Sequence, residues 1–305
     1  MENRLFYQEF QESLMEAVSL ELNKQGTYHC ELTKTQKNNV VLSGLSIRKD
    51  GKASAPIIYL NDSYQSYLQG KPLQQISRQL VEFYRSQEIP EFDHINFVDY
   101  EKMKERLRVR LVSKENNEAY YKRGPYRIHP MGAEVLYVEV DRNESGSMST
   151  QVTNAMAESW KMPKEELFQI ALKNTQNSDK VWFQSMNEAM SEIMTGNAEE
   201  DFDSPMYVLS NKDTQYGATV ALYPDVLKQI SKQIGSDYYI LPSSVHELLI
   251  LKKKDCDITE KELRSMVREI NQSIVSPEEI LGNEVFEYRA DMDRVKKCGK
   301  EDRVR

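Results

Sequence analysis

The chain has 305 residues, a mass of 35.5 kDa and a formal net charge of −8. Hydrophobic residues make up 39% and charged residues 29%, a globular composition that excludes a disordered or fibrous chain. The acidic balance disfavours nucleic acid and anionic lipid as partners, because both repel negative charge, but it does not exclude a local basic patch.

Cysteine usage and hydrophobic runs point to a cytoplasmic protein. Cys30, Cys256 and Cys298 are far apart and outside any CxxC spacing, which argues against a disulfide framework and a zinc module. The first residues lack the apolar core of a secretory signal. The longest apolar runs are about six residues, whereas a membrane span needs about 20, so no membrane partner is predicted.

The first hundred residues predict a helix, three strands and two more helices. Phe6, Phe10, Leu14, Val18 and Leu22 recur every four positions and indicate one helical face. The following segments predict strands over 28–32, 39–47 and 57–60, a short helix after 61, and a helix that Pro72 opens.

Residues 99–111 fit two patterns. Met103, Leu107 and Leu111 repeat every four residues, which favours a helix, whereas Leu107, Val109 and Leu111 alternate with arginines, which favours a strand. The preceding polar run has high helix propensity, so we predict a helix. The interleaved basic series Lys102, Lys104, Arg106, Arg108 and Arg110 is then interpreted as a solvated helical face rather than an anion-binding patch.

The clearest strand of the chain covers residues 133–140. Val135, Leu136, Tyr137 and Val138 form a nearly continuous apolar run, which predicts a central strand covered on both faces. A strand leading into a short helix around Trp160, and a helix that Pro163 opens, are expected to follow.

The last third of the chain mixes strands and helices. Segments 206–209 and 218–222 predict a hairpin, Pro224 opens a helix, and 238–241 and 245–251 predict paired strands. Thr259 and Ser276 begin capping-box sequences. The tail, residues 291–305, is dense in charge and predicted to be disordered.

This irregular order of elements predicts an α+β fold with mixed or antiparallel sheets and helices packed on them. Residues 1–290 are expected to form one large domain or two closely packed subdomains, with a boundary near 197–204. The strand and helix after Ile57 resemble those around Val220 and Pro224, a weak internal strand–helix echo.

One segment offers nucleophilic chemistry. Ser243, Ser244, His246 and Glu247 follow Pro242, and serine with histidine and an acid is the material of a hydrolase. On an extended strand, however, His246 and Glu247 point to opposite faces, and no G-x-S-x-G elbow is present. Ser244 and His246 are therefore the candidate catalytic residues, but a structural turn is favoured.

No pattern predicts a metal or a cofactor. His29, His94 and His129 lack a second ligand at helical spacing, and no glycine-rich phosphate loop occurs. Abundant tyrosine favours half-buried positions or a protein interface.

The sequence resembles an uncharacterised domain-of-unknown-function family of clostridial gut bacteria, often found on mobile elements. The segments that carry the resemblance are NVVLSGLSI at 39–47, APIIYLN at 55–61, MYVLSN at 206–211, GA at 217–218, YPDVL at 223–227, YILPSSVHE at 239–247, MVREIN at 266–271 and PEE at 277–279. A weaker similarity to the YtpQ-like family of bacilli covers the strand at 135 and the helix at 224. Neither resemblance implies an activity or a cofactor.

Three classes of function remain open. A non-enzymatic cytoplasmic protein-interaction or regulatory protein is favoured, because the chain is acidic, rich in tyrosine and without recognisable site motifs. The alternatives are a hydrolase-like enzyme with a site near Ser243, Ser244 and His246, and a nucleic-acid-associated or counter-defence factor of a mobile element. The oligomeric state is left open.

Overall fold

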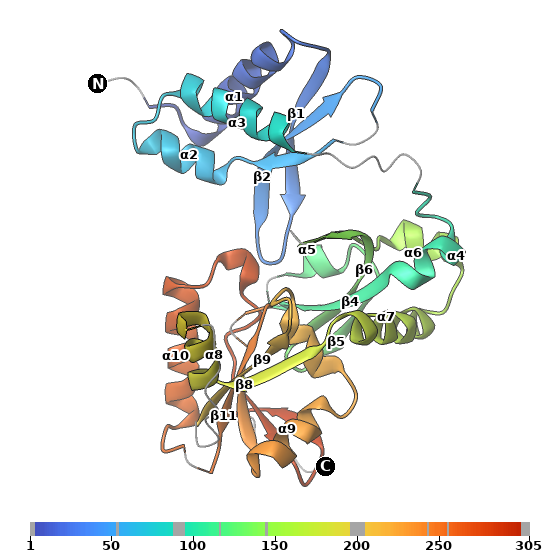
Figure 1. Cartoon of the computed structure of the whole chain (residues 1–305), viewed down its shortest axis with the longest axis vertical. Coiled ribbons are helices and arrows are strands. Elements are labelled where there is room, and N and C mark those ends of the chain that lie inside the picture. Colours follow the sequence, from blue (N-terminus) through green and yellow to red (C-terminus); the bar gives the residue numbers. More distant parts are fainter. Residues whose placement is uncertain are drawn as a thin grey trace. The chain divides into compact units, whose positions relative to one another are not determined.

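The computed structural model of the chain describes residues 4–52, 55–87, 95–115, 117–143, 146–195, 205–242, 244–254 and 256–299. The chain divides into two compact units, Met1–Asn96 and Phe97–Arg305 (Figure 1). The predicted boundary at 197–204 lies outside the described residues, and the division falls much earlier in the chain. No proline-, glycine- or serine-rich stretch marks this division, so composition alone does not reveal it.

The first unit is a three-stranded antiparallel sheet covered on one face by helices. Its elements are α1 (Tyr7–Leu22), β1 (Tyr28–Gln36), β2 (Val41–Lys49), β3 (Ile57–Tyr59), α2 (Asn61–Leu68) and α3 (Leu73–Ser86). The strand order is β1-β2-β3, which leaves β1 at one edge. The predicted stripe Phe10, Leu14 and Val18 is fully buried and packs with Leu45 and Ile47 of β2. Alternation along the strands thus separates a core face from a polar face.

A smaller sheet of the second unit is built around the strand predicted to be central. The elements of this part are α4 (Tyr100–Met103), a 3₁₀ turn (Lys104–Arg106), β4 (Leu107–Val112), α5 (Glu118–Tyr121), β5 (Tyr126–His129), β6 (Gly132–Asn143), β7 (Gly146–Gln151), α6 (Asn154–Trp160) and α7 (Lys164–Ser178). Strand β6 pairs with β4, β5 and β7. Leu136 and Val138 are both fully buried, which confirms the predicted central strand.

A larger, six-stranded antiparallel sheet completes the second unit. Its elements are β8 (Val181–Ser185), α8 (Met186–Thr195), β9 (Met206–Asn211), a 3₁₀ helix (Gly217–Leu222), α9 (Val226–Ile234), β10 (Tyr238–Leu241), β11 (Leu248–Lys252), α10 (Glu260–Ser273), a 3₁₀ turn (Pro277–Glu279), β12 (Phe286–Arg289) and β13 (Arg294–Lys297). The strand order is β13-β12-β10-β11-β9-β8. Ile230 of α9 packs in the core on one face, and Leu263 of α10 in the core on the other.

The predicted helix over 99–111 is wrong beyond Arg106. Only Tyr100–Met103 is α-helical, and Leu107–Val112 is strand β4, paired with β6. Leu107, Val109 and Leu111 are buried, so the alternating pattern decided the structure. Pairing with β6 and burial of one face stabilise the strand more than the helix propensity of the preceding polar run stabilises a helix.

The predicted hairpin of 206–209 with 218–222 is also wrong. Gly217–Leu222 is a 3₁₀ helix, and β9 pairs with β8 and β11 instead. The backbone is pressed against its neighbours here, since a Cβ on Gly217 would lie 2.4 Å from the carbonyl oxygen of His246. The strand–helix echo between 57 and 220 therefore has no strand in its second copy.

The predicted disorder of the tail is wrong for residues 291–299, which form a turn and a strand. Residues 300–305 lie outside the described residues. Arg294–Lys297 pairs with β12 as strand β13, and Cys298 is buried. Val295 and Cys298 anchor this segment in the apolar cores, although lysines and arginines surround them in the sequence.

Separate helices and three antiparallel sheets confirm the predicted α+β class. Within the described ranges, no helix combines the length and the apolar character that crossing a bilayer requires.

Candidate functional site

The loop between β10 and β11 holds the predicted serine and histidine. Ser244 is buried and forms an isolated bridge with Ile280, and Val245 donates its N–H to the carbonyl of Glu279. Ser243 lies outside the described residues. The segment is thus tied to the chain around residue 280 rather than held at a free strand end.

The imidazole of His246 accepts a hydrogen bond from the backbone. Tyr216, whose backbone is left-handed (φ 52°), donates its N–H to Nδ1 at 3.2 Å. Nδ1 is the acceptor in this contact, and Nε2 lies 3.7 Å from the carboxylate of Glu279. Ser244 Oγ accepts the backbone N–H of His246 at 3.0 Å. The structure brings Ser244 and His246 together through the main chain, and this arrangement fixes a loop.

Arg108 and Arg110 share one face of strand β4, and Arg106 directly precedes the strand. Arg106 donates to the carbonyls of Glu139 and Val140, and Arg108 forms an ion pair with the Glu139 carboxylate. Arg110 lies between the rings of Tyr137 and Tyr216, at 4.2 and 3.9 Å from their centroids, and donates to Ser149. These cations stabilise contacts inside the unit.

Histidine, cysteine, aspartate and glutamate supply the side chains that hold metal ions in proteins. Within the part of the chain that the structure describes, no group of three such residues is arranged to hold an ion.

A surface with unused binding capacity lies in the first unit, along the outer edge of β1. Two hydrogen bonds at the ends of the β1–β2 ladder fix its register. Asp50 donates its N–H to the carbonyl of Thr27, and Lys37 donates its N–H to the carbonyl of Val40. The backbone groups of the odd-numbered residues of β1 therefore point toward β2. The N–H and C=O groups of even-numbered residues therefore point outward. Asn23 satisfies the first pair by donating to the carbonyl of Tyr28 and accepting its N–H. This edge, defined by Cys30, Leu32 and Lys34, is called the β1 edge.

Asn23 bonds to Tyr28, next to the β1 edge, and not to the edge itself. Among the residues that the structure describes, none bonds to the outward backbone groups of Cys30, Leu32 or Lys34. An unpaired edge is a template for another extended strand. The edge is short, because α1 and the hairpin turn at Asn38 and Asn39 limit its two ends.

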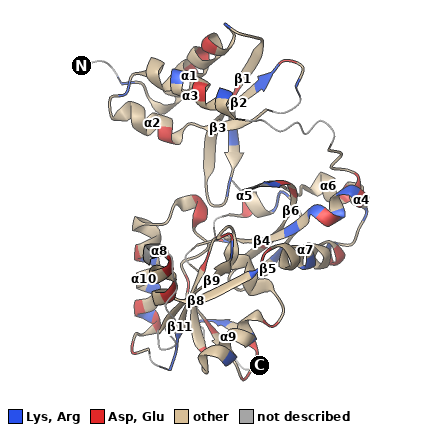
Figure 2. Cartoon of the chain, viewed as in Figure 1, with Lys and Arg blue, Asp and Glu red and all other residues tan. Residues whose placement is uncertain are grey.

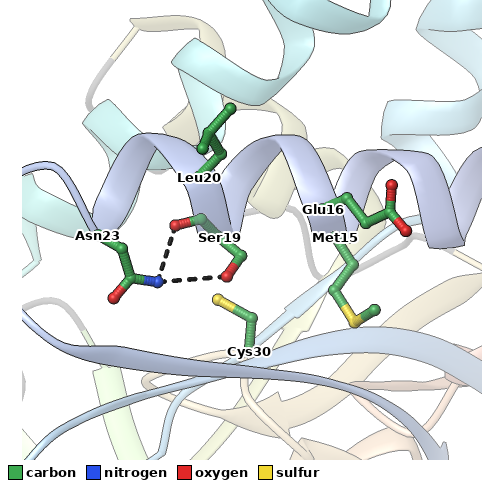
Figure 3. A pocket seen from close by; sticks show the side chains of 6 residues that line it. All are labelled: Met15, Glu16, Ser19, Leu20, Asn23 and Cys30. Carbon is green, nitrogen blue, oxygen red and sulfur yellow. Dashed lines mark hydrogen bonds between the residues drawn. The ribbon is translucent and has the colours of Figure 1, made fainter.

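A groove of about 390 Å³ borders the β1 edge on its α1 side (Figure 3). It is lined by Met15, Glu16, Ser19, Leu20, Asn23 and Cys30. Figure 3 shows the Cys30 thiol pointing from the strand toward Ser19 on the helix. Burial raises the pKa of Cys30, and the hydrogen bond with Ser19 only partly opposes this shift. The thiol is therefore protonated at neutral pH and forms part of an apolar wall.

The groove also has a charge. Helix α1 carries Glu9, Glu12, Glu16 and Glu21 and contains no lysine or arginine (Figure 2). Leu20 is 71% exposed among these acids. Hydrophobic periodicity identifies the buried stripe of α1 and therefore does not reveal this groove. Leu20, an apolar residue outside that stripe on an acidic helix, was the one feature of the sequence that could have indicated it.

The tyrosines, for which the sequence favoured half-buried positions or an interface, mostly pack inside the units. Tyr84, Tyr120 and Tyr121 are buried, and Tyr64 and Tyr67 pack on Phe10.

The chain matches no curated protein and no solved structure. A family model does match it, over residues 7–290, and so includes α1, the β1 edge and the His246 loop. The chain therefore belongs to DUF5688, a family of unknown function.

Proposed function

We propose that this chain is a non-enzymatic protein-interaction protein that binds an extended segment of a partner polypeptide as a fourth strand along the β1 edge. The observation that carries the proposal is the row of outward backbone groups of Cys30, Leu32 and Lys34, which no described residue pairs, beside an open apolar groove. Strand addition uses these two features together, because backbone hydrogen bonds give affinity and a flanking pocket gives specificity.

The expected affinity is moderate. Each added hydrogen bond contributes about 1 kcal/mol, and burial of one leucine-sized side chain in the groove contributes about 2 kcal/mol. Ordering a flexible peptide opposes these gains, so we expect a dissociation constant on the order of 10 µM. Binding of this strength suits a regulatory contact.

The setting that we propose is cytoplasmic. Cys30, Cys256 and Cys298 are all free thiols, which supports a reducing compartment. The net charge of −8 and the internal use of the β4 arginines favour a protein partner over nucleic acid.

Proline substitution tests strand addition directly. Lys34 is exposed and its N–H points outward, so Lys34→Pro removes a donor from the β1 edge while the β1–β2 ladder stays intact. Lys34→Ala retains the N–H and serves as the matched control. The full chain is used to select binders from a phage-displayed library of random decapeptides, and their affinities are measured by fluorescence polarisation.

Selected peptides should bind Lys34→Ala within about fivefold of the wild type, because a cross-strand ion pair with Lys34 contributes at most about 1 kcal/mol. They should bind Lys34→Pro at least tenfold more weakly than Lys34→Ala. Leu20→Ser should weaken binding, whereas Phe83→Ser, which changes an exposed residue of α3 outside the groove, should not. The melting temperatures of all four variants should stay close to that of the wild type. Equal binding to a folded Lys34→Pro variant, or a library without any binder, would overturn the proposal.

A further inference from the structure

We infer that the segment bound at the β1 edge runs antiparallel to β1 and carries the side-chain pattern acidic, any, apolar, basic, apolar. This inference rests on the function proposed above and specifies its partner. It follows from the register of β1, which fixes the face to which each side chain of an added strand points.

The hydrogen-bonding register comes first. Each outward-facing residue of the β1 edge forms a hydrogen-bonded pair with the residue opposite, as the three strands of this sheet already do with one another. The strand pairs of the unit are all antiparallel. The partner's first, third and fifth positions therefore lie opposite Lys34, Leu32 and Cys30.

The apolar positions follow from the face that α1 covers. Cys30 and Leu32 point to the core face, where both pack with the buried residues of α1. Residues directly opposite each other in a ladder point to the same face. The partner's third and fifth side chains consequently lie on the groove side, the fifth beside Ser19 and Leu20 at the level of Cys30. Both positions call for apolar side chains.

The charged positions follow from Glu31 and Lys34, the two charged side chains among residues 30–34. Glu31 is exposed on the opposite face of the sheet, and of the residues that the structure describes none forms an ion pair with it. The partner's fourth residue lies opposite Glu31 in a non-hydrogen-bonded pair, where side chains approach most closely, so a lysine or arginine fits there. Lys34 favours an acidic residue at the partner's first position.

The acidic surface of α1 argues against acidic residues at the third and fifth positions, whose side chains lie on the groove side. Glu12 and Glu16 are both exposed on the helix that borders the groove. A partner segment with negative charge at its centre would meet repulsion from Glu31 on one face and from these acids on the other.

A charge exchange between peptide and protein tests the pattern. The probe is the synthetic peptide Gly-Ser-Glu-Thr-Val-Arg-Leu-Ser-Gly, labelled at its amino end, and the control has glutamate in place of arginine. Both are titrated against the full chain and against Glu31→Lys, which changes an exposed side chain. A third peptide with serine in place of leucine tests the groove.

We expect the arginine peptide to bind the wild type about fivefold more tightly than the glutamate peptide, the upper range for a cross-strand ion pair. Glu31→Lys should reverse this order, which a merely structural role of Glu31 would not do. The serine peptide should bind at least tenfold more weakly than the leucine peptide.

The outcomes separate this inference from the function on which it rests. Equal affinity for the arginine and glutamate peptides, or no reversal in Glu31→Lys, overturns the side-chain pattern. If library-selected peptides of another pattern still lose affinity in Lys34→Pro, strand addition itself stands. Binding of the arginine peptide that is insensitive to Lys34→Pro would instead overturn strand addition.

Discussion

His129 should make the stability of the second unit depend on pH. Its ring is half-buried at the end of β5, where Nδ1 accepts the N–H of Met131 at 3.3 Å. Lys114 lies beside it and donates to the carbonyls of His129 and Pro130. Burial, and to a lesser extent the positive charge of Lys114, lower the pKa of His129 from 6.5 to about 4.

The direction of this pH dependence follows from which state, folded or unfolded, binds the proton more tightly. Between pH 6.5 and pH 4 the unfolded chain binds a proton at His129 that the folded chain does not, so stability falls as the solution becomes more acidic. The stabilisation is fully present above pH 6.5. Integrating between the two pKa values, the loss from pH 7 to pH 5 is about 2 kcal/mol, since each pKa unit corresponds to about 1.4 kcal/mol.

Urea unfolding of the wild type and of His129→Gln at pH 7 and pH 5 measures this contribution. Glutamine preserves an acceptor for Met131 but does not titrate, so the difference between the two pH dependences isolates His129 from the carboxylates. The wild type should lose about 2 kcal/mol more than the variant. Equal losses in both proteins would refute the assignment of a half-buried, neutral His129.

Three further outcomes are expected. Truncation after Ala290 removes β13, whose Val295 and Cys298 are packed in the cores, and should lower the melting temperature by about 5 to 10 °C, whereas truncation after Gly299 should leave it unchanged in differential scanning calorimetry. Gly217→Ala should lower the free energy of unfolding, measured with a chemical denaturant, by more than about 2 kcal/mol, because its Cβ would lie 2.4 Å from a backbone oxygen. Gly282→Ala should lower it by less than about 1 kcal/mol, because the nearest atom would be 3.9 Å away. His246→Gln should lower the free energy of unfolding by about 1 kcal/mol. A fluorophosphonate probe should label neither this variant nor the wild type. Labelling of a serine in the wild type that disappears in His246→Gln would favour the hydrolase-like alternative.

The His246 loop shows how far sequence reasoning reaches into a site. The sequence placed a serine and a histidine at a break between two strands, and the structure has them there. It could not reveal that Tyr216, thirty positions away, donates to the imidazole. Contacts of this separation arise only when the 3₁₀ helix at Gly217–Leu222 docks against the loop.

The β1 edge was hidden for a related reason. Alternation along 28–36 indicates a strand, but a pattern of side chains does not show which of its backbone edges is paired. Strand β2 pairs with one side of β1, and among the described residues Asn23 alone bonds to the backbone on the other side.

The sequence by itself determined the class of the fold, the buried stripe of α1 and the central strand β6. Those features depend on local periodicity and on continuous apolar runs, which a single segment carries within itself. Only the tertiary structure decided that Leu107–Val112 is a strand, that Gly217–Leu222 is a 3₁₀ helix and that Arg294–Lys297 joins the sheet. In each case the local pattern was ambiguous or weak, and the hydrogen bonds and burial offered by a distant partner decided between the alternatives.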